Sequence, residues 1–594
     1  MSSLAAGSSA LRPRFLSSAA RGSRHPLTRQ HVRYASSTKP PNKSAGRWLG
    51  LLAVGIASGT AVYAYPRIFK EEPVAPRHVD VEFETPRKQP TSKEDNRDLI
   101  SPQHLQVKKS WEHPGVYAWG SNAGKVAAPD SNEPVIKNPR RISYFDGQLL
   151  RDLKLDQKFG AAVTENGDLV QWGAGFSKTI ASPIVTLKGK DLVKLSLSKD
   201  RIIALSSSGS VYSVPIAAAD QESGEKPPSS SWIPFWSTPS AISYRTLKPE
   251  NLGWSEKVTD ISSGLEHCLL LTSKGRVFSA ASSSEDFPSR GQLGIPGLSW
   301  ATRPQEVPYD QPHEITTLRG VDVAQIAAGD FHSLVLDKLG SVFSFGDNSA
   351  GQLGFEPQPE SPHINVPSPL SFKDLYSGTA MIPRVTSIAA GGLNSYFTVD
   401  AAKTTNRGNT ADSPPRSGPA NIVADTWACG EGLHGGLGTG KWTHISSEPT
   451  KVKALSNLSE FDEKRNQLVP IKLSSLSVGS THACAVLGNE TNTAASRQRS
   501  DNATNWGLDV VWWGGNEFYQ LGTGKRNNLS TPTYIGPLDG EEGDAKRSIK
   551  GDVNRFQIAP RTTVRLGEGG KGRKASVEQR VECGRYVTAV YSAT

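Results

Sequence analysis

Cysteine is scarce in this chain, with only four among 594 residues, at positions 268, 429, 484 and 583. No two of them have the C-x-x-C spacing of a zinc or redox motif, and each lies in or beside a predicted strand. This scarcity argues against a disulfide framework and against a cysteine-based metal site. We expect four buried, reduced thiols that act as small apolar side chains.

Acidic residues are absent from the first 70 positions, which contain eight Arg and three Lys. Residues 1–46 are also rich in Ser and Ala, which is the composition of a mitochondrial transit peptide. Arg33 lies two residues before a cleavage site expected between Tyr34 and Ala35. The alternative interpretation is a disordered basic tail.

The positive charge of the chain is confined to this leader. Residues 1–70 have a net charge of +11, and the whole chain has a net charge of +10. The other 524 residues therefore have a net charge of about −1. Proteins that bind nucleic-acid phosphates concentrate positive charge on their folded domain. The charge distribution therefore argues against DNA as a partner.

A run without charged residues extends from Trp48 to Tyr65, with basic residues on both sides. Its length is at the lower limit for crossing a bilayer, so we expect a transmembrane helix over residues 47–66. With the leader, this predicts the mitochondrial inner membrane. The Lys and Arg residues before the span favour a folded domain in the intermembrane space, and placement in the matrix stays open. Gly55 and Gly59 form one G-x-x-x-G pair, which either is incidental or allows two spans to dimerise.

Helix signals are weak beyond the predicted flexible tether at residues 67–110. From Trp111 onward, short alternating strands are separated by turns rich in Gly, Asn, Asp and Ser. One unit recurs: a strand ending in glycine, a second strand, a tight turn, a third strand ending in aromatic residues, and a last turn that often reads G-x-L-G. The third strands are expected to start near Val116, Val170, Val211, Val277, Val342, Thr426 and Val511.

Units of this length with four short strands are typical of propeller blades. The first unit, "VYAWGSNAG", begins at its third strand, and the last, "VECGRYVTAVYSAT", has only early strands. We therefore expect an all-β, seven-bladed β-propeller over residues 111–594, closed by N- and C-terminal segments that share one blade.

The stretch "IAAGDFHSLVLDKLGSVFSFGDNSAGQLG" resembles the regulator of chromosome condensation repeat family, whose fold is a seven-bladed propeller. The resemblance implies that the histidine of each unit is a blade-packing residue. Metal ligation is the alternative interpretation, but Asn394 replaces the histidine in one unit. The repeated positions are Gly264, His267, Gly329, His332, Gly391, Gly479 and His482.

The stretch "GGLGTGKW", from Gly435 to Trp442, has the glycine and lysine spacing of a phosphate-binding loop. Trp442 stands where Ser or Thr would bind magnesium, and "LGTGK" recurs from Leu521 as a repeated turn. The chain also shows no Ser-His-Asp set and no metal motif. We therefore expect no enzymatic activity, no cofactor and no metal.

Insertions near residues 215–250, 401–424, 489–507 and 538–580 lie in loops, where binding residues are often found. The first contains Trp232, Ile233, Phe235 and Trp236 in a Pro- and Ser-rich segment. These four residues are the candidate partner contact. The alternative is that the loop buries them against its own propeller.

The combination of leader, single span and propeller resembles a fungal group of mitochondrial inner-membrane proteins with this repeat. The resemblance implies a protein-binding scaffold that assists assembly of respiratory complex III, the cytochrome bc1 complex, with complex subunits or intermediates as partners. Two alternatives stay open: a mitochondrial ribosome or RNA biogenesis factor, and a guanine-nucleotide exchange factor for a mitochondrial small GTPase.

Overall fold

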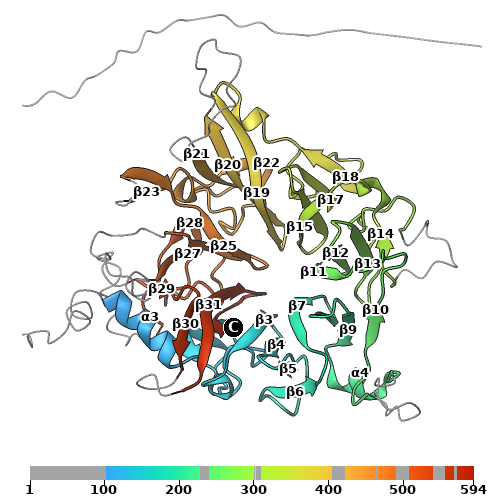
Figure 1. Cartoon of the computed structure of the whole chain (residues 1–594), viewed down its shortest axis with the longest axis vertical. Helices are drawn as coiled ribbons and strands as arrows, with labels where there is room; N and C mark the ends of the chain where they lie inside the picture. Colours follow the sequence, from blue (N-terminus) through green and yellow to red (C-terminus); the bar gives the residue numbers. More distant parts are fainter. Residues whose placement is uncertain are drawn as a thin grey trace, which may run out of the picture. The chain divides into compact units, whose positions relative to one another are not determined.

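Short antiparallel strands separated by glycine turns form a ring of sheets around a central channel (Figure 1). The computed structural model describes residues 102–227, 240–299, 302, 310–403, 422–462, 466–489, 507–538, 555–566 and 572–594. These residues belong to one unit of the chain, Gln89–Thr594. The expected all-β propeller is confirmed, although not its blade number.

Five sheets have the size of one propeller blade. Four of them contain four strands: β7 (Leu192–Leu197), β8 (Arg201–Ser206), β9 (Val211–Pro215) and β10 (Arg245–Leu247); β11 (Val258–Ser263), β12 (His267–Thr272), β13 (Val277–Ala281) and β14 (His313–Glu314); β15 (Val323–Ala328), β16 (His332–Asp337), β17 (Val342–Asp347) and β18 (His363–Leu370); β19 (Met381–Gly391), β20 (Asn394–Lys403), β21 (Ile422–Glu431) and β22 (Ile445–Lys451). The fifth contains β25 (Leu473–Val478), β26 (His482–Leu487), β27 (Leu508–Gly514), β28 (Leu529–Thr533) and β29 (Gln557–Ile558). A separate hairpin joins β23 (Ser459–Asp462) to β24 (Gln467–Pro470).

The remaining strands form one nine-stranded sheet, which overturns the expectation of seven separate blades. Its strands are β1 (Val116–Ser121), β2 (Val135–Arg141), β3 (Leu150–Leu155), β4 (Gly160–Thr164), β5 (Leu169–Trp172), β6 (Ile184–Leu187), β30 (Thr562–Arg565), β31 (Lys574–Cys583) and β32 (Val587–Ala593). Leu150 of β3 and Ala593 of β32 form a parallel bridge, and the Thr594 amide donates to the Leu150 carbonyl at 3.1 Å. The strands expected to make the first two blades are therefore continuous with each other.

Strands from the two ends of the described chain close the ring. β1 pairs with β32 in antiparallel register from Val116↔Tyr591 to Gly120↔Val587. β32 also pairs with β31, so it is flanked on both sides. The predicted closure within one sheet is confirmed, and it removes the free edges that an open array would present.

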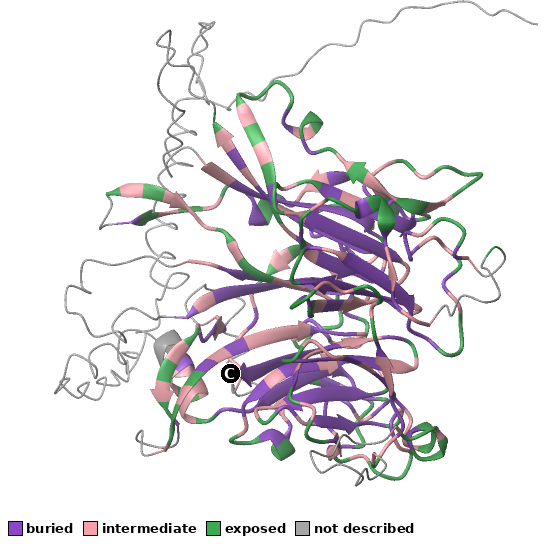
Figure 2. Ribbon diagram, turned by 45° about the vertical axis from the view of Figure 1, so that its right-hand side comes forward, coloured by how far each residue is buried: buried purple, intermediate pink, exposed green. Residues whose placement is uncertain are grey.

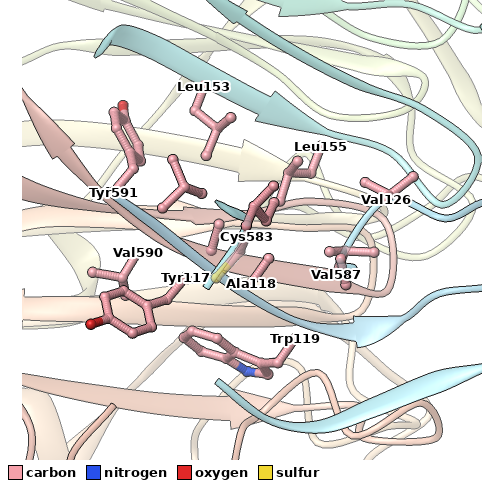
Figure 3. Packing of buried hydrophobic residues seen from close by; sticks show 14 of the residues in the cluster. Tyr117, Ala118, Trp119, Val126, Leu153, Leu155, Cys583, Val587, Val590 and Tyr591 are labelled. Atoms are coloured by element: carbon pink, nitrogen blue, oxygen red, sulfur yellow. The ribbon is translucent and has the colours of Figure 1, made fainter. Parts of the chain in front are cut away.

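Both β1 and β32 are buried along their whole length, and their side chains form the largest apolar cluster (Figure 3). Trp119, Val590 and Tyr591 pack there with Cys583. The near-continuous apolar runs of these strands are what burial on both faces requires. The prediction that all four cysteines are buried is confirmed.

The channel is lined by one inner strand from each repeat unit: β3, β7, β11, β15, β19, β25 and β31. Glycines lie where inner strands turn into the next strand, and backbone hydrogen bonds link these turns around the ring, such as Leu265 N to Asp330 O at 3.0 Å and Asp330 N to Gly392 O at 2.8 Å. We call this end, which carries Gly264, Gly329, Gly391, Gly479 and Gly584, the glycine face. The opposite end carries the hairpin turns 273–276 and 338–341, and we call it the turn face. Buried residues concentrate in the strands between the two (Figure 2).

Two helices accompany the sheets. α3 (Pro102–Glu112) occupies the end of the segment expected as a tether and contacts β29 and β31. α4 (Ala218–Ser223) lies within the insertion expected near 215–250. The expected membrane-spanning helix is not found, since no helix among the described residues is long and apolar enough to cross a bilayer. The segment 47–66 itself lies outside the described residues.

Candidate functional site: the channel and the glycine face

Two of the sites predicted from the sequence cannot be placed. Trp232, Ile233, Phe235 and Trp236 lie outside the described residues, and so do Arg33, Tyr34 and Ala35. The repeated glycine and histidine positions all lie at the glycine face, where each histidine begins the second strand of its unit. The site is therefore built from the glycine face and the channel that opens there.

Each of the three repeated histidines donates a hydrogen bond to a hydroxyl of the next unit. His267 Nε2 lies 2.9 Å from Ser333 Oγ, and His332 Nε2 lies 2.9 Å from Ser395 Oγ. His482 Nε2 lies 2.7 Å from Thr588 Oγ1. These bonds connect neighbouring sheets of the ring.

The same hydroxyl also donates a hydrogen bond to a turn in the unit that contains the histidine. Ser333 Oγ donates to the Gln292 carbonyl at 3.0 Å, and Ser395 Oγ donates to the Gln352 carbonyl at 2.6 Å. Each hydroxyl donates its only proton to the carbonyl, so it can only accept the hydrogen bond from the histidine. The imidazole proton therefore lies on Nε2. We call this path of two hydrogen bonds, from the imidazole through the hydroxyl to the glutamine carbonyl, the relay. The glutamine belongs to the repeated G-x-L-G turn, so that turn has a structural role in the relay.

Sequence reasoning missed these hydroxyl partners, although a signal was present. Where a unit lacks the histidine, as at Asn394, the next unit has an apolar residue, Ala483, in place of the hydroxyl. A serine or threonine directly after the histidine position therefore indicates that the preceding unit contains the histidine. The separation of 63 to 106 residues between the bonded partners hides this pattern from local inspection.

Burial keeps two of these histidines, His267 and His332, neutral. Burial lowers the pKa of His267 to about 3, and it lowers the pKa of His332 to about 4. No group of three or more His, Cys, Asp and Glu side chains suited to a metal ion occurs among the described residues. The histidines hold sheets together in this geometry.

The relay requires glycine opposite the imidazole. A Cβ placed on Gly329 would lie 2.1 Å from Cε1 of His332 and 2.9 Å from the Gly392 carbonyl. Real Cβ atoms do not approach other atoms so closely, so a larger residue would displace the ring or the neighbouring turn. This explains the spacing of glycine and histidine that recurs in the sequence.

The channel next to the glycine face has a volume of about 270 Å³ and contains a half-buried ion pair. Lys154 Nζ lies 2.7 Å from Glu582 Oε2 and 3.8 Å from Asp152 Oδ1. Burial alone would lower the pKa of Lys154, but the two carboxyl groups outweigh it and hold that pKa above its usual value. With two acids for one base, burial raises the pKa of Glu582 to about 7.

Arg585 is fixed at the channel mouth between two acids. Its guanidinium lies 3.3 Å from Asp156 and 3.0 Å from Asp330, which belong to different inner-strand turns. These carboxylates raise the pKa of Arg585 against the effect of burial. The next residue, Tyr586, has a φ of 62°, and its ring packs against Phe518 with centroids 5.1 Å apart. A non-glycine residue held in this left-handed region indicates local strain.

The loop between β21 and β22, at the same end of the ring, carries two exposed apolar side chains. Trp442 is 58% exposed and Leu433 is 47% exposed. Their loop meets the next one where His434 Nδ1 lies 3.8 Å from Glu517 Oε1. Arginine and aromatic side chains are enriched in protein-binding hot spots, and Arg585, Tyr586, Phe518 and Trp442 all lie at this end of the ring. The glycine face can therefore receive a protein partner.

The stretch resembling a phosphate loop is a turn between β21 and β22. The Gly436 carbonyl accepts a hydrogen bond from Trp513 Nε1 at 2.8 Å and one from the Tyr396 hydroxyl. The stretch is followed by strand β22, starting at Ile445, and so lacks the helix that a phosphate loop needs. Its backbone supports the next sheet.

The comparisons with known proteins agree with this architecture. Residues 289–336 and 340–397 match the regulator of chromosome condensation (RCC1) repeat, and residues 323–352 match a second description of the same repeat. These matches bear out the resemblance to the repeat over residues 289–397. A human structure, WBSCR16, superposes with a TM-score of 0.51 at 17% identity, over 81% of this chain and 99% of that one. This likeness bears on the fold alone.

Two relatives align over most of the propeller. Protein FMP25, mitochondrial, of Saccharomyces cerevisiae is 26% identical over 70% of this chain and 64% of its own length. RCC1 domain-containing protein RUG3, mitochondrial, of Arabidopsis thaliana is 24% identical over 63% of this chain and 72% of its own length. The aligned part therefore spans just under two thirds of the yeast protein.

Proposed function

We propose that this chain is a mitochondrial, non-enzymatic protein-binding propeller whose glycine face receives the partner. The observation that carries the proposal is that relatives from yeast and from a plant, aligned over 70% and 63% of the chain, are both mitochondrial proteins. The basic leader, free of acidic residues, supports the same compartment. If Arg33 directs processing, the mature protein begins at Ala35, which N-terminal sequencing of the protein from mitochondria would detect.

The partner we propose is an assembly intermediate of respiratory complex III. The resemblance to fungal mitochondrial proteins with this repeat supports that choice, and the channel mouth supplies a suitable contact surface. Arg585 is held by Asp156 and Asp330, and it is adjacent to the ring pair of Tyr586 and Phe518. Groups fixed before binding lose little conformational freedom on association, which favours affinity.

The client is tested by depleting the protein and separating respiratory complexes on a native gel. Selective loss or stalling of complex III supports the proposal. A joint fall of every complex with organelle-encoded subunits would indicate ribosome or RNA biogenesis instead. An unchanged gel would contradict both and favour exchange activity on a small GTPase.

The binding face is tested separately with a matched pair of variants. Trp442→Ser combined with Leu433→Ser alters exposed side chains at the glycine face, whereas Trp254→Ser alters one exposed side chain at the turn face. We expect the first variant to lose the co-purifying partner and the second to retain it, with unchanged melting temperatures in both. Equal retention by both would reject the glycine face as the contact.

A further inference from the structure

The most exposed large apolar side chain among the described residues lies at the turn face. Trp254 is 94% exposed, in the loop between β10 and β11. An indole in contact with water over almost its whole surface is unfavourable, and burying it would gain about 25 cal/mol per Å² of apolar area. The loop therefore holds Trp254 in a position that only an external surface can cover.

This loop is rigidly built. Glu256 is buried beneath it and accepts hydrogen bonds from the Gly253 amide at 2.8 Å and from Thr272 Oγ1 at 2.6 Å. Asn251 and Ser255 flank the tryptophan with φ values of 55° and 62°. Two non-glycine residues in the left-handed region cost conformational energy, and the buried carboxylate stabilises the arrangement that projects the indole.

Other exposed apolar side chains lie at the same end of the ring. Leu339 is 82% exposed at the tip of the turn between β16 and β17. Ile382 is 58% exposed at the start of β19. Backbone and side-chain contacts connect these positions: Val323 N donates to Gly275 O at 3.2 Å, and Arg384 donates to the Lys338 carbonyl at 2.7 Å.

The hairpin β23–β24 adds a further pair at this end. Phe461 and Leu468 are direct cross-strand neighbours, 49% and 60% exposed. Each of these groups is a single side chain or a single pair on its own turn, and polar residues separate the groups. The turn face thus presents several apolar tips instead of one continuous apolar patch.

Lysines without a carboxylate partner lie on loops at the same end of the ring. No acidic oxygen lies within 4.0 Å of them among the residues that the structure describes. The exposed lysines of this kind are Lys248, Lys257, Lys274, Lys373, Lys403 and Lys453. They outnumber the exposed acids of the same loops, Glu250 and Asp374, so this sector is basic.

The opposite end of the same sheets is acidic. The glycine-face loops that follow β11, β13, β15 and β17 carry Glu266, Glu285, Asp286, Asp330, Asp347, Glu356 and Glu360. Lys199, Arg290 and Arg585 pair with some of these acids and neutralise only part of their charge. This sector of the ring is therefore polarised along the axis, so an anionic surface would attract its turn-face end and repel its glycine-face end.

We propose that the turn face docks on an anionic lipid bilayer, with Trp254 and Leu339 in the headgroup region and the lysines at the same end of the ring against lipid phosphates. A protein interface needs a contiguous, well-packed apolar core. Separate tips suit a headgroup layer, which admits single side chains at one depth, and tryptophan prefers this region. Docking would leave the glycine face directed away from the membrane and free for a protein partner.

Cosedimentation of the full chain with lipid vesicles tests the proposal. One set contains phosphatidylcholine alone, and the other contains about one fifth phosphatidylserine, the kind of lipid that attracts basic segments. We expect Trp254→Ser with Leu339→Ser to weaken binding to the anionic vesicles roughly ten-fold, given the apolar area removed. Lys257→Gln with Lys274→Gln should weaken it roughly five-fold per lysine, since each lysine near such a surface contributes about 1 kcal/mol.

The matched control is Trp442→Ser with Leu433→Ser, which removes exposed apolar groups from the acidic end. The basic leader is present in every variant, so it adds an equal background and only differences between variants count. Wild-type affinity in the turn-face variant, or an equal loss in the control, would overturn the proposal. Unchanged vesicle binding with loss of a co-purifying protein would assign the turn face to a protein partner.

Fluorescence gives a second readout specific to one side chain. The difference in emission between the wild type and Trp254→Phe isolates the indole at position 254. We expect lipids brominated along their acyl chains to quench this difference signal on anionic vesicles. A signal that brominated lipids do not change would place Trp254 outside the bilayer and contradict the proposal, whatever the affinity.

Discussion

His267 and His332 make the free energy of unfolding depend on pH, and His332 allows that dependence to be measured. In the unfolded chain its pKa is near 6.5, whereas burial holds it near 4 in the fold. Between these values the unfolded state binds a proton that the folded state rejects, so stability is complete above pH 6.5 and falls on acidification. From pH 7 to pH 5 this difference amounts to about 2 kcal/mol for one histidine.

The substitution His332→Asn tests this reasoning with a residue that the fold already uses, since Asn394 occupies the corresponding place in the next unit. The variant loses a hydrogen bond to Ser395 at every pH, but it also loses the titrating group. Urea unfolding at pH 7, 6 and 5 should therefore show a loss of stability on acidification that is smaller by about 2 kcal/mol than in the wild type.

The control is His434→Asn, because that imidazole lies at the surface beside Glu517. This variant separates the effect of the relay position from the effect of removing any imidazole. Asp347 lies near His332 and favours its protonation, so Asp347→Asn should steepen the loss slightly. If His332→Asn and the wild type lose stability in parallel from pH 7 to pH 5, the histidine is not held neutral and the reasoning is refuted.

Three further predictions concern the same ring. Ser395→Ala leaves the imidazole of His332 unsatisfied in the core and leaves the Gln352 carbonyl with only the weak Cys429 thiol as a donor. Chemical unfolding should therefore show a loss of about 2 kcal/mol, and Ser395→Thr should restore part of it. Burial raises the pKa of Glu582 to about 7, so its contribution to the free energy of unfolding is complete below pH 4.5 and is lost as pH rises through 7. Glu582→Gln should remove this loss of stability, and an unchanged dependence of stability on pH would contradict the prediction. Gly329→Ala should lower the melting temperature by at least several degrees, because its Cβ would overlap the imidazole, and a neutral result would show that the turn adapts.

Local patterns in the sequence predicted the repeat units well. The expected third strands near Val116, Val211, Val277 and Val342 begin at those residues in β1, β9, β13 and β17. Alternation of side chains and glycine turns is local information, and it specified these strands. The expected pairing of the first and last units also followed from incomplete units at the two ends.

Contacts between units could not be predicted in the same way. The relay from His482 to Thr588 spans 106 residues, and no local rule connects them. The bridge between Leu150 and Ala593 depends on how closely two strand ends approach, which residue types do not determine. Trp254 was missed because an aromatic residue in a loop looks like core until its exposure is known.

The pairing of β1 with β32 has a consequence for how the protein reaches its native state. β1 is the first strand of the ring to leave the ribosome or an import pore, and its partner β32 is the last. Until β32 arrives, β1 exposes an apolar edge, and the ring behaves as an open array that can pair with other chains. Closure of the ring therefore waits until its last strand is available, so the edge of β1 stays exposed for longer than in proteins whose partner strands are adjacent in sequence.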